Sequence, residues 1–210
     1  MKADKKTNMQ REGLSRRGFL QGVGAGGAVT GILTGCTSLD RNGAVTLEPR
    51  GPDETAITLI VNGSRRNLNV EPRVTLLDAL RNRLDLTGAK KVCDRGTCGS
   101  CTVLMDGEPA YSCSILAVEA AGREITTVEG LGSPEDMNAV QEAFVENDAQ
   151  QCGFCTPGFV VACTAVLEKN PDASLEEAQV GCGGNLCRCG TYTGMNQALL
   201  DAAKSLKGGK

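Results

Sequence analysis

The sequence predicts an α+β protein in which a small sheet domain is followed by a bundle of helices. In residues 55–132, apolar residues alternate in short runs between turn dipeptides, as expected for strands. In residues 133–210 they recur with the period of a helix instead. Cysteines gather between the expected elements in both halves, so their spacing must be interpreted together with the fold.

The composition excludes several classes of function. The 210 residues include eleven cysteines and no histidine, and the net charge is −3. Without histidine the chain cannot form a Ser-His-Asp triad, a Rieske centre or a c-type haem attachment site. The charge argues against a nucleic-acid partner, since no basic block follows the N-terminus. Any bound metal must therefore be held by thiolates or carboxylates.

Residues 1–36 have the pattern of an export signal. A polar, basic segment ends in Arg16 and Arg17, and residues 18–39 carry no charge. The sequence "SRRGFLQ" resembles a twin-arginine signal, with Gln21 where lysine is common. The alternative is a transmembrane anchor, but the stretch is rich in glycine and weakly apolar for a span. The pattern predicts export to the periplasm.

The end of this segment offers two interpretations. "LTGC" at residues 33–36 looks like a lipobox, in which case a lipidated Cys36 would tether the mature protein to a membrane. Ordinary cleavage nearby would discard Cys36 or leave it idle. Residues 37–54 are polar and contain Pro and Gly, which predicts a linker.

The first half reads as strands around one helix. Residues 56–61 and 65–70 alternate around an Asn62-Gly63 turn, which predicts a hairpin. Thr75 is positioned to cap a helix over the following residues. A second hairpin should turn at Asp106-Gly107, and residues 124–128 should form the last strand. These elements predict a domain spanning residues 55–132.

The cysteines of this half have the spacing of a cluster-binding loop. "CDRGTCGSC" gives C-x4-C-x2-C in a glycine-rich segment, which is the plant-type spacing for a [2Fe–2S] cluster. The fourth cysteine follows sooner than is usual. A zinc knuckle and a set of disulfides are the alternatives. The four candidate ligands are Cys93, Cys98, Cys101 and Cys113.

Four helices are predicted in residues 133–210, with more cysteines in the loops between them. In "QCGFCTPG" at residues 151–158, Thr156 is the expected cap of an apolar helix. Cys155 should lie at its N-terminus, where the helix dipole favours a thiolate. "NLCRCG" at residues 185–190 should precede the last helix. A redox C-x-x-C pair and a four-thiolate zinc site remain alternatives, although C-x-C is unusual for structural zinc.

The three cysteine motifs in this order resemble the iron–sulfur subunit of the molybdenum hydroxylases, the family of xanthine oxidase, aldehyde oxidoreductase and carbon monoxide dehydrogenase. The resemblance covers roughly residues 55–207. It implies a β-grasp, ferredoxin-like domain followed by a four-helix bundle, each with one [2Fe–2S] cluster. With the export signal, the chain is most similar to the small subunits of periplasmic aldehyde dehydrogenases and isoquinoline-type oxidoreductases.

The resemblance also implies roles for individual residues. Cys93, Cys98, Cys101 and Cys113 would bind an outer cluster, and Cys152, Cys155, Cys187 and Cys189 an inner one. Gln151 matches the glutamine that hydrogen-bonds the molybdopterin cofactor of the large partner subunit. Substrate would be oxidised on that partner, and a flavin subunit or a cytochrome would accept the electrons.

Arg188, Cys163 and Cys182 lie in or near these motifs and need separate interpretations. Arg188 is expected to raise the potential of the inner cluster, because reduction adds a negative charge, and the alternative is that it is only a surface charge. Cys163 lies inside an apolar helix and is expected to be a small core residue, and a Cys163–Cys182 disulfide is a weaker alternative.

Two rival functions remain, a stand-alone exported ferredoxin and a disulfide-stapled secreted binding module.

Overall fold

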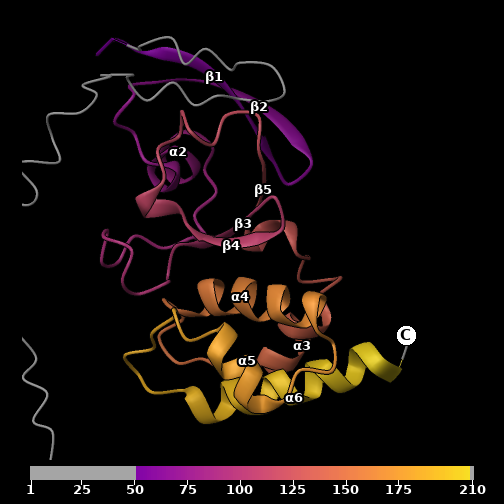
Figure 1. Ribbon diagram of the computed structural model, residues 1–210. Helices are drawn as coiled ribbons and strands as arrows, with labels where there is room; N and C mark the ends of the chain where they lie inside the picture. Colours follow the sequence, from indigo (N-terminus) through magenta and orange to yellow (C-terminus); the bar gives the residue numbers. More distant parts are fainter. Residues whose placement is uncertain (1–50, 209–210) are drawn as a thin grey trace, which may run out of the picture. The chain divides into compact units, whose positions relative to one another are not determined.

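The computed structural model describes residues 51–208, in which a five-stranded sheet with one helix is followed by four further helices (Figure 1). The export signal, the lipobox at Cys36 and most of the predicted linker lie outside the described residues. Between residues 51 and 208, no helix is both long enough and apolar enough to cross a bilayer.

The first two strands form the predicted hairpin. β1 (Thr55–Val61) pairs antiparallel with β2 (Ser64–Val70). Asn62 and Gly63 both have positive φ, at 50° and 72°, as the tight two-residue turn between twisted strands requires. Alternate residues of β1 are buried in the core of the sheet domain.

The helix and the second hairpin of this half also lie where the sequence predicts them. α2 (Leu76–Arg83) begins after Thr75, whose side chain accepts a hydrogen bond from the Asp78 N–H. β3 (Thr102–Met105) and β4 (Glu108–Tyr111) pair antiparallel across the Asp106-Gly107 turn. Leucines of α2 are completely buried against the sheet.

The strand order shows the β-grasp arrangement. β5 (Glu124–Thr126) lies between β1 and β3, parallel to β1 and antiparallel to β3, giving the order β2-β1-β5-β3-β4. The strand is shorter than the predicted 124–128, because the chain turns into the 3-10 helix η2 (Val128–Gly130). The predicted ferredoxin-like domain is confirmed.

The second half contains the four predicted helices: α3 (Ala139–Glu146), α4 (Thr156–Lys169), α5 (Leu175–Gly181) and α6 (Tyr192–Gly208). One expected cap is wrong. Cys155 rather than Thr156 is the residue before α4, and its helical backbone (φ −84°, ψ −21°) makes Thr156 the first helical residue. The hydroxyl of Thr156 is buried and has no hydrogen-bond partner among the described residues.

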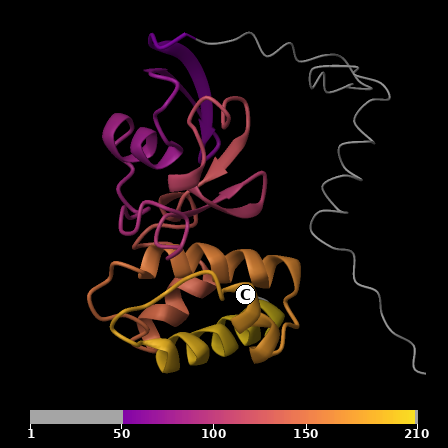
Figure 2. The same ribbon diagram turned by 60° about the vertical axis from the view of Figure 1, so that its left-hand side comes forward.

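Helix α4 joins the two halves. It packs against β3 and β4 on one side and against α3 and α5 on the other, as the views in Figures 1 and 2 both show. Leu104 of β3 and Val161 and Ala165 of α4 form a small buried cluster between them. Because α4 is buried almost all round, its N-terminal loop is held against the sheet domain.

Candidate metal centres

The first four candidate ligands, called here the outer set, come together beside the sheet. Cys93, Cys98 and Cys101 lie in the loop between α2 and β3, and Cys113 lies in the 3-10 helix η1 (Ser112–Ser114) that follows β4. The thiols contact one another in two pairs, Cys93 with Cys98 and Cys101 with Cys113. The first pair is half-buried and the second is buried.

The glycines of this loop allow backbone N–H groups to face the sulfurs. Gly96 has φ +68°, and its N–H donates to Cys113 Sγ at 3.2 Å. The next N–H, that of Thr97, donates to Cys93 Sγ at 3.4 Å. A side chain at position 96 would come within 2.7 Å of Ser114 Oγ, so the fold leaves no room for one. The loop is therefore shaped to surround a group bound by the sulfurs.

Hydrogen bonding and burial act differently on the thiols of the outer set. Hydrogen bonds from Thr97, working against partial burial, lower the pKa of Cys93 to about 6. Burial raises the pKa of Cys101 to about 12. The donors around Cys93 stabilise negative charge on sulfur, which is what bound thiolates of an anionic cluster need.

The other four candidates, called here the inner set, converge from two loops that are far apart in the sequence. Cys152 and Cys155 precede α4, and Cys187 and Cys189 precede α6. Their thiols again contact in pairs, Cys155 with Cys187 and Cys152 with Cys189. Here the first pair is buried and the second is exposed.

Two residues at the start of α6 hold Cys187 through its N–H and its sulfur. The Cys187 N–H donates to the Tyr192 hydroxyl at 2.8 Å, and Cys187 Sγ lies 3.2 Å from Thr191 Oγ1. Against the effect of burial, hydrogen bonding to Thr191 lowers the pKa of Cys187 to about 7. Cys155 lies at the N-terminus of α4 as expected, yet burial and the neighbouring Cys187 thiol raise its pKa to about 12. Burial thus opposes the thiolate form that a helix N-terminus favours.

The pairwise arrangement fits a cluster with two irons. Each iron of a [2Fe–2S] cluster takes two thiolates, and each set offers two contacting pairs.

The two sets are joined by a direct contact between their loops. Leu186, which precedes Cys187, donates its N–H to the Cys98 carbonyl at 2.9 Å. The buried Asn185 side chain donates to the Gly99 carbonyl at 2.9 Å and lies 3.2 Å from Thr102 Oγ1. One hydrogen bond thus separates a cysteine of the outer set from the residue next to a cysteine of the inner set. Nothing in the spacing of the motifs indicated this contact.

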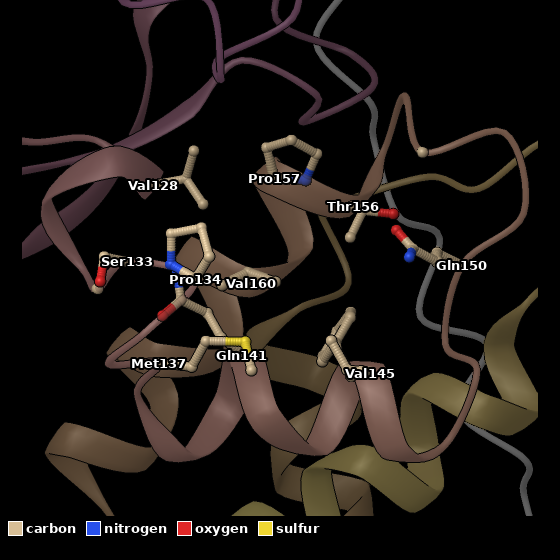
Figure 3. A pocket seen from close by; sticks show the side chains of 13 residues that line it. Val128, Ser133, Pro134, Met137, Gln141, Val145, Gln150, Thr156, Pro157 and Val160 are labelled. Atoms are coloured by element: carbon tan, nitrogen blue, oxygen red, sulfur yellow. The ribbon is translucent and has the colours of Figure 1, made fainter.

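An exposed face lies beside the inner set. Gln151 is exposed next to Cys152, and the Phe154 side chain between the two cysteines is 56% exposed. A pocket of about 330 Å³ opens alongside, between α3 and the start of α4 (Figure 3). The apolar side chains that line it include Val128, Pro134, Met137, Val145, Pro157 and Val160.

Comparison with known proteins agrees with this geometry. Residues 59–127 match the 2Fe-2S iron-sulfur cluster binding domain family, and residues 127–200 match the [2Fe-2S] binding domain family. The aldehyde oxidoreductase iron-sulfur-binding subunit PaoA of Escherichia coli K12 is 39% identical, over 92% of this chain and 90% of its own. The nicotine 6-hydroxylase small subunit of Paenarthrobacter nicotinovorans is 47% identical over 73% of this chain and 93% of its own.

A solved structure shows the same fold. The crystal structure of quinoline 2-oxidoreductase from Pseudomonas putida 86 superposes with a TM-score of 0.71 at 44% identity, covering 75% of this chain and 98% of that chain. The two domain families, the two related subunits and the solved structure thus indicate the same family. The chain belongs to the iron–sulfur subunits of the molybdenum hydroxylase family, and it is an electron-transfer subunit that binds two [2Fe–2S] clusters.

Proposed function

We propose that this subunit serves an exported, molybdenum-dependent oxidoreductase whose substrate is an aldehyde. The similarity to the Escherichia coli aldehyde oxidoreductase subunit supports this substrate class. Because the similarity spans 92% of the chain, it extends into the first fifty residues and supports export as well. The nicotine 6-hydroxylase subunit is more identical, at 47%, but over only 73% of the chain. An N-heterocycle is therefore the second candidate substrate.

The two sets of paired thiols support the proposed cluster ligands. The outer set would bind one [2Fe–2S] cluster and the inner set the other, with each contacting pair on one iron. When bound, the clusters supply two centres that each take up one electron. The chain contributes N–H groups at Gly96 and Thr97 and a hydroxyl at Thr191, which stabilise the negative charge on the sulfurs.

The contact between the two loops is the observation that carries the proposal. Electron transfer in series needs two centres held at a short, fixed separation. The Leu186–Cys98 backbone hydrogen bond fixes the loops of both sets against each other, and the buried Asn185 reinforces it. A ferredoxin that acts alone would not need a second cysteine set attached to the first in this way.

The exposed face at the inner set is the surface that we expect the large subunit to cover. Gln151 would contact the molybdopterin cofactor there, as the family resemblance implies. Exposed Phe154 and the neighbouring apolar pocket give this face the character of the core of a protein interface. Covering it would also remove Cys152 and Cys189 from water.

The N-terminal segment supports a location in the periplasm. Arg16 and Arg17 followed by an uncharged stretch predict twin-arginine export, a route for proteins that are already folded around a cofactor. Lipidation of Cys36 would then tether the complex to a membrane. A flavin subunit or a cytochrome is the proposed electron acceptor.

Metal analysis of the complex tests the proposal. The tagged protein is purified gently from its native host, and iron and molybdenum are measured together with the co-purifying chains. We expect four irons and one molybdenum per complex, and reduction of the iron–sulfur absorbance on adding an aldehyde. If an N-heterocycle reduces the clusters and no aldehyde does, the substrate class is an N-heterocycle instead of an aldehyde.

Two other outcomes would contradict the proposal. Four irons without molybdenum, from a preparation that contains this chain alone after cross-linking in the cells, would favour a stand-alone ferredoxin. Oxidised thiols without iron would indicate a disulfide-stapled module. Fractionation of the host cells, with a Arg16→Lys, Arg17→Lys variant as the control, tests export separately from the metal content.

A further inference from the structure

Two cysteines of the described chain belong to neither cluster set, and they face each other. Cys163 lies in the middle of α4, and Cys182 follows α5. Their sulfurs are 3.2 Å apart in the core of the helical half. Cys163 is completely buried and Cys182 is 5% exposed. The sequence alone favoured Cys163 as a simple core residue, whereas the structure places it in contact with a second thiol.

The two helices approach closely at this point. Gly181, the last residue of α5, lies against Val166 of α4, and a side chain there would come within 2.4 Å of Val166 Cγ2. Cys182 is fixed in turn by its N–H, which donates to the Ala178 carbonyl at 3.0 Å. The two sulfurs are therefore held together by the close packing of α5 on α4, and forming a bond between them requires only a small further approach.

We propose that Cys163 and Cys182 form a disulfide that joins α4 to α5. The proposal stands on the geometry of this pair and does not depend on the substrate or the compartment proposed above. The oxidant is a low-molecular-weight disulfide. A cavity of about 280 Å³ is lined in part by Cys163 and Cys182 and provides a route toward the pair.

The reaction is an exchange in two steps. Cys182, the more accessible of the two, attacks one sulfur of the oxidant as a thiolate and releases one thiol. Cys163 then attacks the Cys182 sulfur of the mixed disulfide and releases the second thiol. The two electrons and two protons lost by the cysteines end on the two sulfurs of the oxidant. Attack by Cys182 first agrees with the hydrogen bond between the two thiols. This hydrogen bond, together with burial, raises the pKa of Cys163, whereas it lowers the pKa of Cys182.

The disulfide would strengthen the segment that connects the two cluster sites. The Cys182 carbonyl accepts a hydrogen bond from the Asn185 N–H at 2.9 Å, and the Asn185 side chain reaches the Gly99 carbonyl. Leu186 and Cys187 follow directly. A covalent link at Cys182 therefore fixes one end of the loop that contacts the outer set and carries a cysteine of the inner set.

Mass mapping of the holoprotein tests the proposal. The protein is incubated with oxidised glutathione or with a dithiol reductant, denatured in acid, alkylated in excess reagent and digested. After oxidation we expect a peptide pair linked through Cys163 and Cys182, while the eight cluster cysteines are alkylated. The link should raise the midpoint of thermal unfolding by roughly 5–10 °C over the reduced protein.

The variant Cys182→Ala is the matched control. It should lose the linked peptide, leave Cys163 alkylated, and show no difference in unfolding midpoint between oxidised and reduced samples. Alkylation of both Cys163 and Cys182 in oxidised wild-type protein that keeps all its iron would overturn the proposal. A stable mixed disulfide with glutathione at Cys182 would overturn it as well. In both cases the retained iron would leave the assignment of the cluster cysteines unaffected.

Discussion

The two cysteine sets of this subunit reach a similar pairwise arrangement by different routes. Three thiols of the outer set come from one nine-residue loop, whose glycines turn the backbone N–H groups toward sulfur. The inner set is assembled from two loops at the starts of α4 and α6. The outer site thus depends mainly on local sequence, with only Cys113 brought in by the β3–β4 hairpin, whereas the inner site exists only when the helical bundle has folded.

The sets also differ in where their exposed thiols lie. In the inner set Cys152 and Cys189 are exposed, next to the exposed Phe154. In the outer set the more accessible pair, Cys93 and Cys98, is half-buried. A partner that covers this face would shield both the exposed thiols and the apolar side chains from water. The difference agrees with the proposal that the large subunit covers the face beside the inner set.

Removal of one thiol from each set should have the largest effect. We expect Cys101→Ala to abolish the outer cluster and Cys155→Ala to abolish the inner one, because three thiolates leave one iron incompletely bound. Each variant should contain about half the iron of the wild type. Iron analysis and electron paramagnetic resonance of the reduced proteins would show which of the two signals is lost.

The two losses should differ in their effect on the fold. Because the inner set is assembled by the helical bundle, Cys155→Ala should also expose the bundle to proteolysis, whereas Cys101→Ala should leave the bundle resistant. Cys182→Ala, which removes a buried thiol outside both sets, is the control and should keep all the iron. Full iron content in Cys155→Ala would show that Cys155 is not a ligand.

Local features of the fold could be predicted from the residues themselves, whereas long-range arrangements were predicted only through the family resemblance or were missed. The turns at Asn62-Gly63 and Asp106-Gly107 and the cap at Thr75 depend on neighbouring residues, and the structure confirms them. The position of β5 between β1 and β3 depends on pairing across many residues, which periodicity does not encode. The Asn185–Gly99 contact joins residues 86 apart in the chain and was missed for the same reason.

The error at the start of α4 has a physical explanation. Thr156 before Pro157 has the residue types of a cap, which led to the wrong expectation. In the structure Cys155 already has a helical backbone, and its thiol contacts that of Cys187. Thr156 is consequently the first residue of the helix, and its hydroxyl has no hydrogen-bond partner within residues 51–208. The arrangement of the site overrides the local preference for a capping hydroxyl.

A pair of glycine variants tests how firmly the two sets are joined. Gly99 and Gly107 both have positive φ, at 70° and 80°. A side chain at Gly107 would meet nothing within 4 Å, whereas one at Gly99 would come within 2.6 Å of both Asn185 and the Gly184 carbonyl. Gly107→Ala should lower the free energy of unfolding by about 1–2 kcal/mol through backbone strain alone. Gly99→Ala should cost about 1–3 kcal/mol more, because the loops must move apart.

Urea unfolding of the two variants measures this difference, and hydrogen exchange locates it. The Leu186 N–H should lose protection in Gly99→Ala and keep it in Gly107→Ala, because only the first substitution separates Leu186 from Cys98. Equal stability of the two variants, with Leu186 equally protected, would mean that the loops can adjust without losing their contact.

The smallest effect is expected from the charge of Arg188, which lies between Cys187 and Cys189 of the inner set. Arg188 is exposed, and its cation should favour the reduced cluster, which carries one more negative charge. Arg188→Ala should therefore lower the inner potential by about 10–40 mV in the isolated subunit, where water and salt screen the charge. Arg188→Lys keeps the charge and should remain close to the wild-type potential. A redox titration monitored by electron paramagnetic resonance measures both variants.

The same titration in the assembled complex tests the proposed orientation of the subunit. If the large subunit covers the face beside the inner set, water is excluded around Arg188 and the charge is screened less. The shift caused by Arg188→Ala should then be larger in the complex than in the isolated subunit. An unchanged potential in both would show that Arg188 is only a surface charge. A shift of equal size in both would place the partner on another face, because the environment of Arg188 would be the same with and without it.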